Sequence, residues 1–255
     1  MVRQTSRTTV SQCTSASSGT KRISVAMTTY NGASFIKEQM DSICFQLTAD
    51  DEIIVSDDGS TDETLQILKS YQNGTVPVRI IEGPKAGIKK NVENALMHCS
   101  GQYIFLADQD DIWFADKVNC VLECFADEKI NLVIHDAVVF SEDTNKPVMD
   151  SFFAFRNAKA GILKNIWKNS YIGCCMAFRA TLLKQALPIP SNIEMHDQWL
   201  GILNDFYYKK SYFLNKPLLY YRRHSDNNSA MVPYSTGKRL KNRLIFIGQF
   251  LRRIL

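Results

Sequence analysis

The 255-residue sequence lacks any run of about 18 consecutive apolar residues, the length that a helix needs to cross a bilayer. Residues 1–20 are rich in Ser and Thr but have no apolar core, so they do not resemble a secretory signal. Their Arg and Ser content and their lack of acidic residues also fit a transit peptide. Composition favours the simpler prediction, which is a disordered tail over residues 1–20.

The glycine-rich motifs of common nucleotide-binding proteins are also missing. There is no G-x-G-x-x-G after a strand and no G-x-x-x-x-G-K-[ST], which argues against dinucleotide oxidoreductases and P-loop triphosphatases. A G-x-S-x-G nucleophile elbow is absent as well. The run 57–60 (DDGS) resembles the nucleophile loop of some phosphatases, but those enzymes place the second Asp two positions after the first.

A strong charge of one sign is likewise absent. Thirty basic and 26 acidic residues give a net charge of +4, which is too small to indicate a nucleic-acid partner. The seven cysteines are odd in number and lie mostly in apolar runs, so they are expected to be buried thiols in a reducing compartment. No second Cys/His pair accompanies Cys120 and Cys124 at zinc-finger spacing. These features predict a cytoplasmic protein.

What the sequence does contain is an alternation of apolar runs and helical patterns over residues 21–140. The expected strands are 23–29, 52–56, 78–81, 103–107 and 132–134, and the expected helices are 35–43, 61–68, 91–99 and 118–125. Ser60 or Thr61 is expected to cap the second helix. Continuous apolar strands that alternate with helices predict an α/β fold with a mostly parallel central sheet flanked by helices.

Acidic clusters follow two of these strands. Asp57 and Asp58 end the second strand, and Asp108, Asp110 and Asp111 end the fourth. Ligands of open α/β sheets bind beyond the carboxyl ends of the strands, so both clusters should meet at one rim. Crowded carboxylates repel one another unless a hard divalent cation joins them. The alternative is a solvated acidic turn.

Residues 141–235 follow a looser pattern. The stretch 151–168 is aromatic and basic, 171–178 and 216–221 are strand-like, and 196–199 (HDQW) opens a helix. This half is expected to be built onto the first rather than to fold alone. The sequence thus predicts one domain over 21–235, in which the second half (141–235) is built onto the first (21–140).

Residues 236–255 predict a basic amphipathic helix. Apolar residues recur every three or four positions, at Leu240, Leu244, Ile247, Leu251 and Ile254. Six basic residues and no acidic residue lie between 238 and 255. Such a helix is expected to lie on an anionic surface, here the inner face of the cell membrane. The alternative is a helix that packs on the domain or forms a dimer.

Four motifs now stand in a fixed order: 27–32 (MTTYNG), 55–64 (VSDDGSTDET), 108–113 (DQDDIW) and 196–199 (HDQW). Together they resemble family 2 glycosyltransferases of the GT-A fold, over roughly residues 21–225, which implies a nucleotide-binding half (21–140) and an acceptor-binding half (141–235). The resemblance implies that Thr28 and Tyr30 line the nucleotide base and ribose and that Asp58 bonds the pyrimidine. It also implies that Asp108 lies near the ribose.

The same resemblance assigns Asp110 as the ligand of a metal on the diphosphate and Asp197 as the general base. The other possibility for Asp197 is a helix N-cap. Neutral His224 could add a metal ligand, although a surface histidine in a basic loop is the competing interpretation. Lys90, with its neighbours Lys89 and Asn91, is expected near the diphosphate, and a solvated helix start is the alternative.

The resemblance implies inverting transfer of a sugar from a nucleoside diphosphate, in one displacement with Mn²⁺ or Mg²⁺ as cofactor. The DQDDIW run and a late R-x-H-x-x-N are similar to bacterial rhamnosyltransferases, which favours a dTDP- or UDP-sugar donor carrying L-rhamnose. The acceptor would be a polysaccharide or lipid-linked glycan. Two alternatives remain. One is a sugar-nucleotide nucleotidyltransferase, which would need a basic, Gly-rich loop after the first strand that 30–33 (YNGA) does not provide. The other is a non-catalytic sugar-nucleotide-binding protein.

Overall fold

The computed structural model describes residues 21–209, 211–224 and 235–255. The predicted disordered tail therefore lies outside the described residues. Eight strands of the described part form one sheet in the order β3-β2-β1-β4-β7-β6-β8-β5. They are β1 (Ile23–Thr29), β2 (Glu52–Asp57), β3 (Val78–Glu82), β4 (Tyr103–Asp108), β5 (Ile112–Trp113), β6 (Leu132–Phe140), β7 (Met176–Arg179) and β8 (Tyr212–Arg222).

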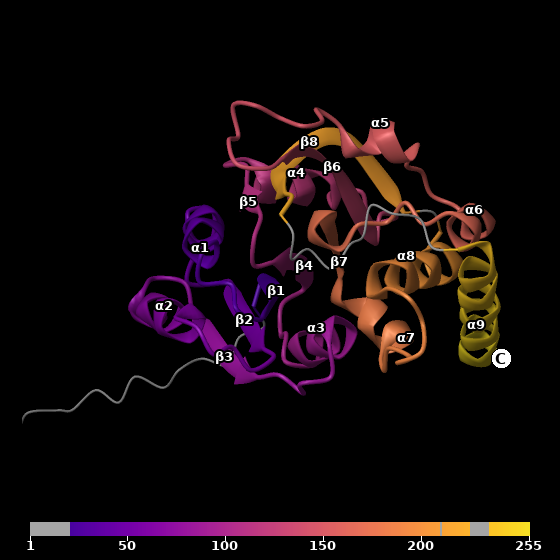
Figure 1. The fold of residues 1–255 in the computed structure, drawn as a ribbon, viewed down its shortest axis with the longest axis horizontal. Helices are drawn as coiled ribbons and strands as arrows, with labels where there is room; N and C mark the ends of the chain where they lie inside the picture. Colours follow the sequence, from indigo (N-terminus) through magenta and orange to yellow (C-terminus); the bar gives the residue numbers. More distant parts are fainter. Residues whose placement is uncertain (1–20, 210, 225–234) are drawn as a thin grey trace, which may run out of the picture.

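Helices flank this sheet, as Figure 1 shows. They are α1 (Ile36–Cys44), α2 (Thr64–Ser70), α3 (Ile88–Met97), α4 (Lys117–Cys124), α5 (Phe152–Arg156), α6 (Ile162–Trp167), α7 (Leu183–Ala186), α8 (His196–Tyr207) and α9 (Thr236–Ile254). Short 3₁₀ turns occur at η1 (Tyr71–Asn73), η2 (Gly173–Cys175) and η3 (Ala180–Leu182). The α/β class and the mostly parallel sheet are confirmed.

The first half of the sheet is parallel. β1 lies between β2 and β4, and β3 extends the sheet beyond β2. β1 is buried along its whole length, as expected for a strand covered on both faces, and α3 packs against β1 and β2. Because these strands run in one direction, their carboxyl ends share one edge.

The second half is mixed. β7 pairs antiparallel with both β4 and β6, β6 pairs parallel with β8, and β8 pairs antiparallel with β5. β6 extends to Phe140, well beyond the expected end at 134, because β8 continues to pair with it. The strand expected over 171–178 is shorter, since η2 occupies its middle and only Met176–Arg179 is extended.

Two local expectations need correction. α2 begins at Thr64 with no side-chain cap, because the Ser60 hydroxyl donates to Asp57 instead. The aromatic stretch 151–168, for which no element was expected, forms α5 and α6. The short length of these helices, five and six residues, explains why periodicity did not reveal them.

The predicted C-terminal helix is present as α9, which stands at one edge of the molecule beside α6 and α8 (Figure 1). It packs on the domain through Phe246, which contacts Trp199, and Phe250, which contacts Phe206. The apolar face that periodicity singled out is on the other side, where Leu240 and Leu244 are 53% and 63% exposed. None of the described helices is long and apolar enough to cross a membrane.

Candidate active site

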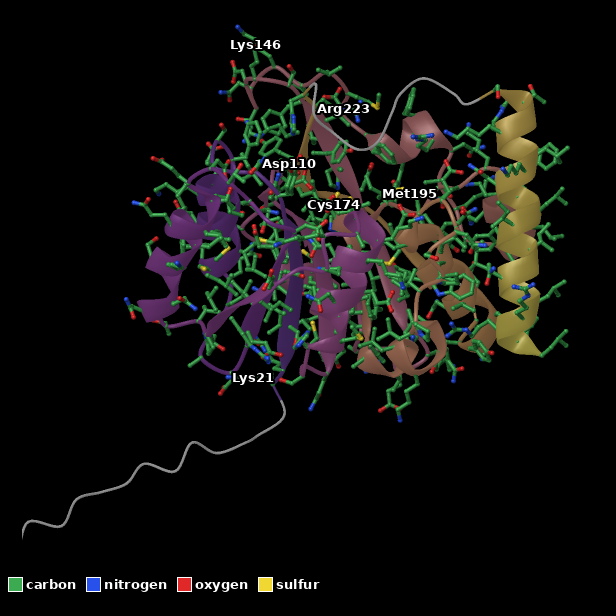
Figure 2. The ribbon with its side chains drawn as sticks, turned by 60° about the horizontal axis from the view of Figure 1, so that its bottom comes forward. Lys21, Asp110, Lys146, Cys174, Met195 and Arg223 are labelled. Carbon is green, nitrogen blue, oxygen red and sulfur yellow. The ribbon has the colours of Figure 1, made fainter. Side chains whose placement is uncertain are left out.

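The carboxyl ends of β1, β2 and β4 bring the predicted donor-binding residues together. Thr28 is in register with Ser56 of β2 and with Asp108 of β4, so the ends of all three strands are level. Asp58 follows directly, and its backbone N–H donates to the carbonyl of Thr29 at 2.9 Å. In Figure 2, Asp110 lies toward the end of the sheet opposite Lys21, which precedes β1.

The two adjacent aspartates after β2 have different partners. Asp57 is buried and accepts hydrogen bonds from the hydroxyls of Thr29 (2.7 Å) and Ser60 (2.6 Å). Asp58 instead accepts the backbone N–H groups of Lys85 (2.6 Å) and Gly87 (3.1 Å). Asp57 therefore holds its own turn in place, while Asp58 ties that turn to the loop before α3.

A glutamine in the acidic run joins two of the loops at the rim. Gln109 Oε1 accepts the backbone N–H of Tyr30 at 2.8 Å, and its Nε2 donates to the Tyr30 carbonyl at 3.0 Å. This paired contact leaves the Tyr30 side chain 58% exposed. The sequence prediction concentrated on the carboxylates and missed Gln109, although its place inside the acidic run was visible.

The expected diphosphate contacts near α3 have partners within the protein. Lys90 Nζ donates to Glu93 (2.6 Å) and to the carbonyl of Ile189 (3.0 Å). Lys89 donates to two carbonyls of the segment 191–193. Asn91 is buried, and its amide bonds Ser56. These contacts connect α3 to β2 and to the segment before α8.

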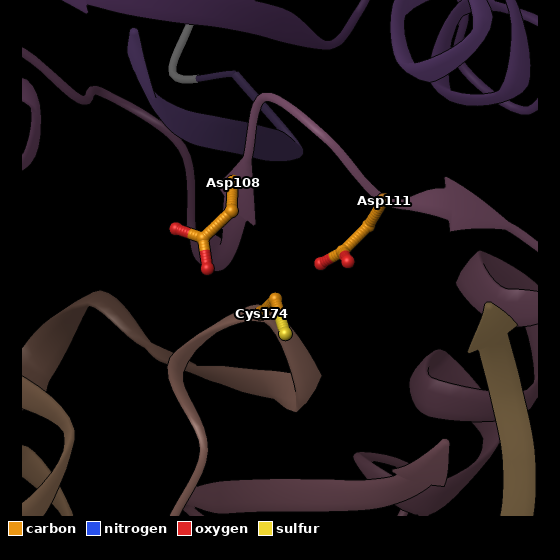
Figure 3. A group of neighbouring side chains, drawn as sticks. All are labelled: Asp108, Asp111 and Cys174. Carbon is orange, nitrogen blue, oxygen red and sulfur yellow. The ribbon is translucent and has the colours of Figure 1, made fainter. Parts of the chain in front are cut away.

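Three potential metal ligands converge beneath the rim. The carboxylates of Asp108 and Asp111 and the Cys174 thiol lie within 4.8 Å of one another, and Figure 3 shows all three side chains directed toward one space. Asp111 Oδ1 accepts the backbone N–H of Arg222 at 3.1 Å. Asp111 Oδ2 is buried and has no hydrogen-bond partner among the described residues.

Burial sets the protonation of this cluster. Burial, followed by the negative charges of Asp110 and Asp197, raises the pKa of Asp108 to about 7, and the charge of Lys117 acts in the opposite direction. The pKa of Asp111 also lies well above its usual range, first through burial and then through its acidic neighbours. Carboxylates that resist ionisation in the bare protein are suited to a cation, which removes the cost of their charge.

A buried lysine adjoins the cluster, and the sequence prediction missed it. Lys117 is 1% exposed, its ammonium lies 3.8 Å from the centre of the Trp113 ring, and it donates to the Cys174 carbonyl at 2.9 Å. Burial lowers the pKa of Lys117 to about 8, whereas the nearby thiols and carboxylates act in the opposite direction. Its positive charge partly offsets the acidic cluster.

The structure also brings together the two predicted metal ligands, Asp110 and His224. His224 Nε2 lies 2.8 Å from Asp110 Oδ2, although 114 positions separate the residues. The His224 ring packs against Phe35, with 4.7 Å between centroids. Arg222 fixes the strand end because its Nε donates to the Asp110 carbonyl at 2.8 Å and its Nη2 to Glu38 at 2.5 Å.

These residues fit a divalent cation. The orphaned Asp111 oxygen marks a buried acceptor without a donor, and Asp110 offers a carboxylate oxygen beside an imidazole nitrogen. Carboxylates suit Mg²⁺ and Mn²⁺, and the imidazole favours the transition ion. The solvated acidic turn is the wrong alternative, because Asp111 is fully buried and Asp110 pairs with His224.

Asp197 is the second residue of α8, and Met195 is the N-cap, so the N-cap alternative for Asp197 is wrong. Its carboxylate is buried and accepts from Asn169 Nδ2 (3.2 Å) and from the backbone N–H of Gln198 (2.5 Å). Burial is the main cause that raises the pKa of Asp197 to about 7. Trp199 anchors the same helix by donating to the Ala186 carbonyl at 2.8 Å.

Asp197 also forms part of the wall of a pocket of about 560 Å³. The pocket lies among α5, α6, α8, α9 and the strands β6 and β8. The charge of Asp197 raises the pKa of Asp108, so the pocket wall and the acidic rim are electrostatic neighbours. Asp197, with a pKa of about 7, thus adjoins both the cavity and the acidic rim.

The family model described as "Glycosyl transferase family 2" matches residues 24–187, which is more than half of the chain. This chain belongs to glycosyltransferase family 2. A curated relative is the dTDP-rhamnosyl transferase RfbG of Shigella flexneri, 27% identical over 214 residues that cover 79% of this chain and 72% of the relative. The chondroitin synthase of Pasteurella multocida is 33% identical over 107 residues, which cover 42% of this chain and only 11% of that protein.

Solved structures show the GT-A fold of this glycosyltransferase. TarS 1–349 of S. aureus in complex with UDP-GlcNAc has a TM-score of 0.68 at 21% identity, covering 89% of this chain and 66% of that one. Glucosyl-3-phosphoglycerate synthase of Mycobacterium tuberculosis, solved with Mn²⁺, UDP and glucosyl-3-phosphoglycerate, has a TM-score of 0.56 at 18% identity, with 91% and 80% covered.

The raised pKa of Asp197 leads to a prediction about stability. Its pKa in the fold is about 7, above the ordinary value of 3.8, so ionisation destabilises the native state progressively as pH rises from about 4 to 7. Glu194 reinforces this shift and Arg156 opposes it. Asp197→Asn keeps both hydrogen-bond acceptor contacts and removes the charge. Thermal unfolding should therefore show a gain in Tm of several degrees at pH 8 and a smaller gain at pH 5.

The control is Asp50→Asn, which neutralises an exposed carboxylate and should change Tm little at either pH. A Tm for Asp197→Asn that falls below wild type at pH 8 would contradict the burial of an ionised carboxylate at this position.

Proposed function

We propose that this protein is an inverting, metal-dependent glycosyltransferase that moves a sugar from a nucleoside diphosphate to a polysaccharide or lipid-linked glycan. The observation that carries the proposal is the convergence of Asp58, Asp108 and the Asp110–His224 pair at one rim. Asp197, on the wall of the adjoining pocket, completes the arrangement. A donor at the rim and an acceptor in the pocket would meet beside Asp197.

The donor nucleotide would bind at the ends of β1 and β2. Thr28 and Tyr30 would line the base and ribose, with the exposed Tyr30 ring available for stacking. Asp58 would contact the pyrimidine, and its two backbone donors already hold it in position. Asp108 would face the ribose. Lys90 remains a prediction for the diphosphate, and reaching it would require Lys90 to exchange its contacts with Glu93 and Ile189.

Asp110 and His224 would hold Mn²⁺ or Mg²⁺, which stabilises the charge that develops on the leaving diphosphate. Arg222, the last residue of β8, would hold the following segment with His224 in place through its contacts with Glu38 and the Asp110 carbonyl. Manganese in the solved glucosyl-3-phosphoglycerate synthase belongs to that protein, and it supports the same class of ion here.

Asp197 would accept the proton of the acceptor hydroxyl as that oxygen attacks the sugar carbon. The new bond to the acceptor oxygen forms while the bond to the diphosphate breaks on the opposite face. A base whose pKa lies near 7 can be ionised at neutral pH and still bind a proton well. Asn169 would position the carboxylate by donating to Oδ1.

A deoxyhexose donor, with L-rhamnose as the leading candidate, is supported by similarity to the dTDP-rhamnosyl transferase. A relative in Escherichia coli is named for transfer of glucose from UDP to a sugar on diphosphoundecaprenol, with 26% identity over 184 residues. The carboxylate of Asp197 beside the pocket favours sugar transfer over nucleotidyl transfer, since the nucleophile of a nucleotidyl transfer is an ionised sugar phosphate that needs no general base.

The exposed face of α9 supports contact with an anionic membrane. Leu240, Leu244 and Leu251 remain exposed although the helix is docked on the domain through its other side. Basic residues and no acidic residue lie between 236 and 254. Buried apolar area and attraction to anionic lipids together determine binding of such helices to a membrane surface.

The metal proposal predicts that Asp110→Asn removes most Mn²⁺-dependent stabilisation by a nucleoside diphosphate and lowers sugar transfer at least about 10²-fold. Thermal shift with dTDP and Mn²⁺, and turnover of the nucleotide sugar, measure the two effects. Asp127→Asn, an exposed carboxylate on another loop, is the matched control and should behave as wild type. Full activity of the wild-type protein in excess chelator would contradict the proposal.

The membrane proposal predicts that the double substitution Leu240→Gln and Leu244→Gln weakens binding to phosphatidylglycerol-containing vesicles at least about fivefold, because two apolar side chains no longer insert. Flotation of the full chain measures this. Phe45→Gln with Met97→Gln changes two equally exposed apolar side chains outside α9 and serves as the control. Equal flotation of the two double variants would refute a membrane-binding role for α9.

A further inference from the structure

The pocket beside Asp197 carries more positive charge than a neutral glycan requires. Among the residues that the structure describes, its charged lining residues are Arg156, Lys168, Glu194, Asp197, Arg223, Arg239 and Arg243. Five of these are basic and two are acidic. Glu194 accepts a hydrogen bond from Asn242 at 2.8 Å, and Asp197 is committed to Asn169 and Gln198. Among the described lining residues other than Arg223, the four cations Arg156, Lys168, Arg239 and Arg243 still outnumber these two carboxylates, which indicates an anionic ligand.

Aromatic rings hold two of these arginines in fixed planes. The Arg156 guanidinium lies 5.5 Å from the Phe152 ring centre and 5.7 Å from that of Phe155. Arg243 lies 3.8 Å from the Trp167 ring centre and donates to the Trp167 carbonyl from Nε and Nη2. A guanidinium beside an aromatic ring keeps its N–H groups for hydrogen bonds, but Arg243 uses Nε and Nη2 on the Trp167 carbonyl, which makes Arg156 the better phosphate contact.

Arg156 is the arginine most available to a ligand. Within the described residues it makes no hydrogen bond or ion pair, and its contacts are the two rings. Its charge is close enough to Asp197 to lower the pKa of that carboxyl. A negative group bound to Arg156 would therefore lie near the proposed base.

Apart from Asn169, Gln198 and Asn242, most of the remaining lining residues are apolar or aromatic. They include Val139, Met149, Ile166, Ile172 and Phe246. Two of the aromatic lining residues, Phe155 and Trp167, are also exposed to solvent, by 52% and 68%. Figure 2 labels two lining residues, Arg223 and Met195, in the region between the sheet and α9. Apolar walls beside arginines match a phosphate that is attached to a hydrocarbon chain.

We propose that this pocket binds a phosphate or diphosphate group of the acceptor, with Arg156 as a principal contact and the acceptor hydroxyl at Asp197. The proposal rests on the proposed function, because it specifies the acceptor of that reaction. It adds a chemical class that transfer to a glycan does not require. The phosphate fixes the acceptor's register, so the reacting hydroxyl lies beside the base.

The test uses the full chain in EDTA, so that metal-dependent binding of phosphates at the Asp110–His224 site does not contribute. The probe is dodecyl phosphate below its critical micelle concentration, and calorimetry gives its affinity. Arg156→Gln should weaken binding at least about tenfold, the loss expected for one charge-assisted contact. The control is Lys159→Gln. Lys159 is exposed, lies three positions after Arg156 and does not line the pocket, so this variant loses one positive charge and should bind as wild type.

Two further probes separate the sources of phosphate. Dodecyl maltoside, which has the chain without the charge, should bind at least tenfold more weakly than dodecyl phosphate. Inorganic phosphate should also lose affinity in Arg156→Gln. Tighter binding of dodecyl phosphate than of inorganic phosphate assigns a lipid-linked acceptor. Equal affinities for dodecyl phosphate and inorganic phosphate would support the phosphate contact and indicate a water-soluble phosphorylated glycan as the acceptor.

The proposal is overturned if Arg156→Gln and Lys159→Gln bind dodecyl phosphate equally, or if the maltoside binds as tightly as the phosphate. Failure of the proposed function appears elsewhere. Stabilisation of Arg156→Gln by dTDP and Mn²⁺ should match wild type, and absence of that stabilisation in the wild-type protein would count against the donor site alone.

Discussion

Buried negative charge at the carboxyl edge of the parallel strands is the constraint on which the rest of this structure depends. Asp111 is fully buried and Asp108 is partly buried beside it, and ionised carboxylates are costly in such surroundings. The protein offsets that cost with the Lys117 ammonium and with the backbone N–H of Arg222. The unpaired oxygen of Asp111 leaves the cluster incompletely compensated, and a cation held nearby by Asp110 and His224 would lower the remaining cost of its negative charge.

The same edge explains how the two halves of the domain are joined. β8 pairs with β6 and β5, and its last residue, Arg222, reaches back to Glu38 of α1 and to the Asp110 carbonyl. On the opposite side, Lys89 connects α3 to the segment that precedes α8. Both connections run between the first half of the domain and the second. The relative position of Asp110 and Asp197 is therefore determined by contacts that the site itself contains.

The sequence predicted the parallel half of this fold well because its signals are local. Continuous apolar strands such as 103–107 end at carboxylates, and the topology rule then places those carboxylates at one rim. The extent of β6 and the short helices α5 and α6 could not be predicted, since they depend on pairing and packing between distant segments. The sequence predicted that α9 is amphipathic, but only the contacts with Trp199 and Phe206 show that Phe246 and Phe250 are its buried residues.

At the site, local motifs identified Asp58, Asp110 and Asp197 but not the groups that position them. Lys117 has the sequence pattern of an ordinary helix start, and only the fold shows that its side chain is buried over Trp113. Gln109 and Asn169 likewise have roles that arise from contacts 79 and 28 positions away. Proximity of His224 to Asp110 depends on β8, whose pairing no local pattern reveals.

The central claim is that the acidic rim binds a divalent cation together with a nucleoside diphosphate. The most direct measurement is the anomalous scattering of Mn²⁺ in crystals grown with MnCl₂ and dTDP. The account predicts one strong peak that is coordinated by Asp110 and His224 and lies beside the diphosphate. Nucleotide bound at the rim without manganese at those residues, or manganese found only among Asp108, Asp111 and Cys174 and away from the diphosphate, would contradict it.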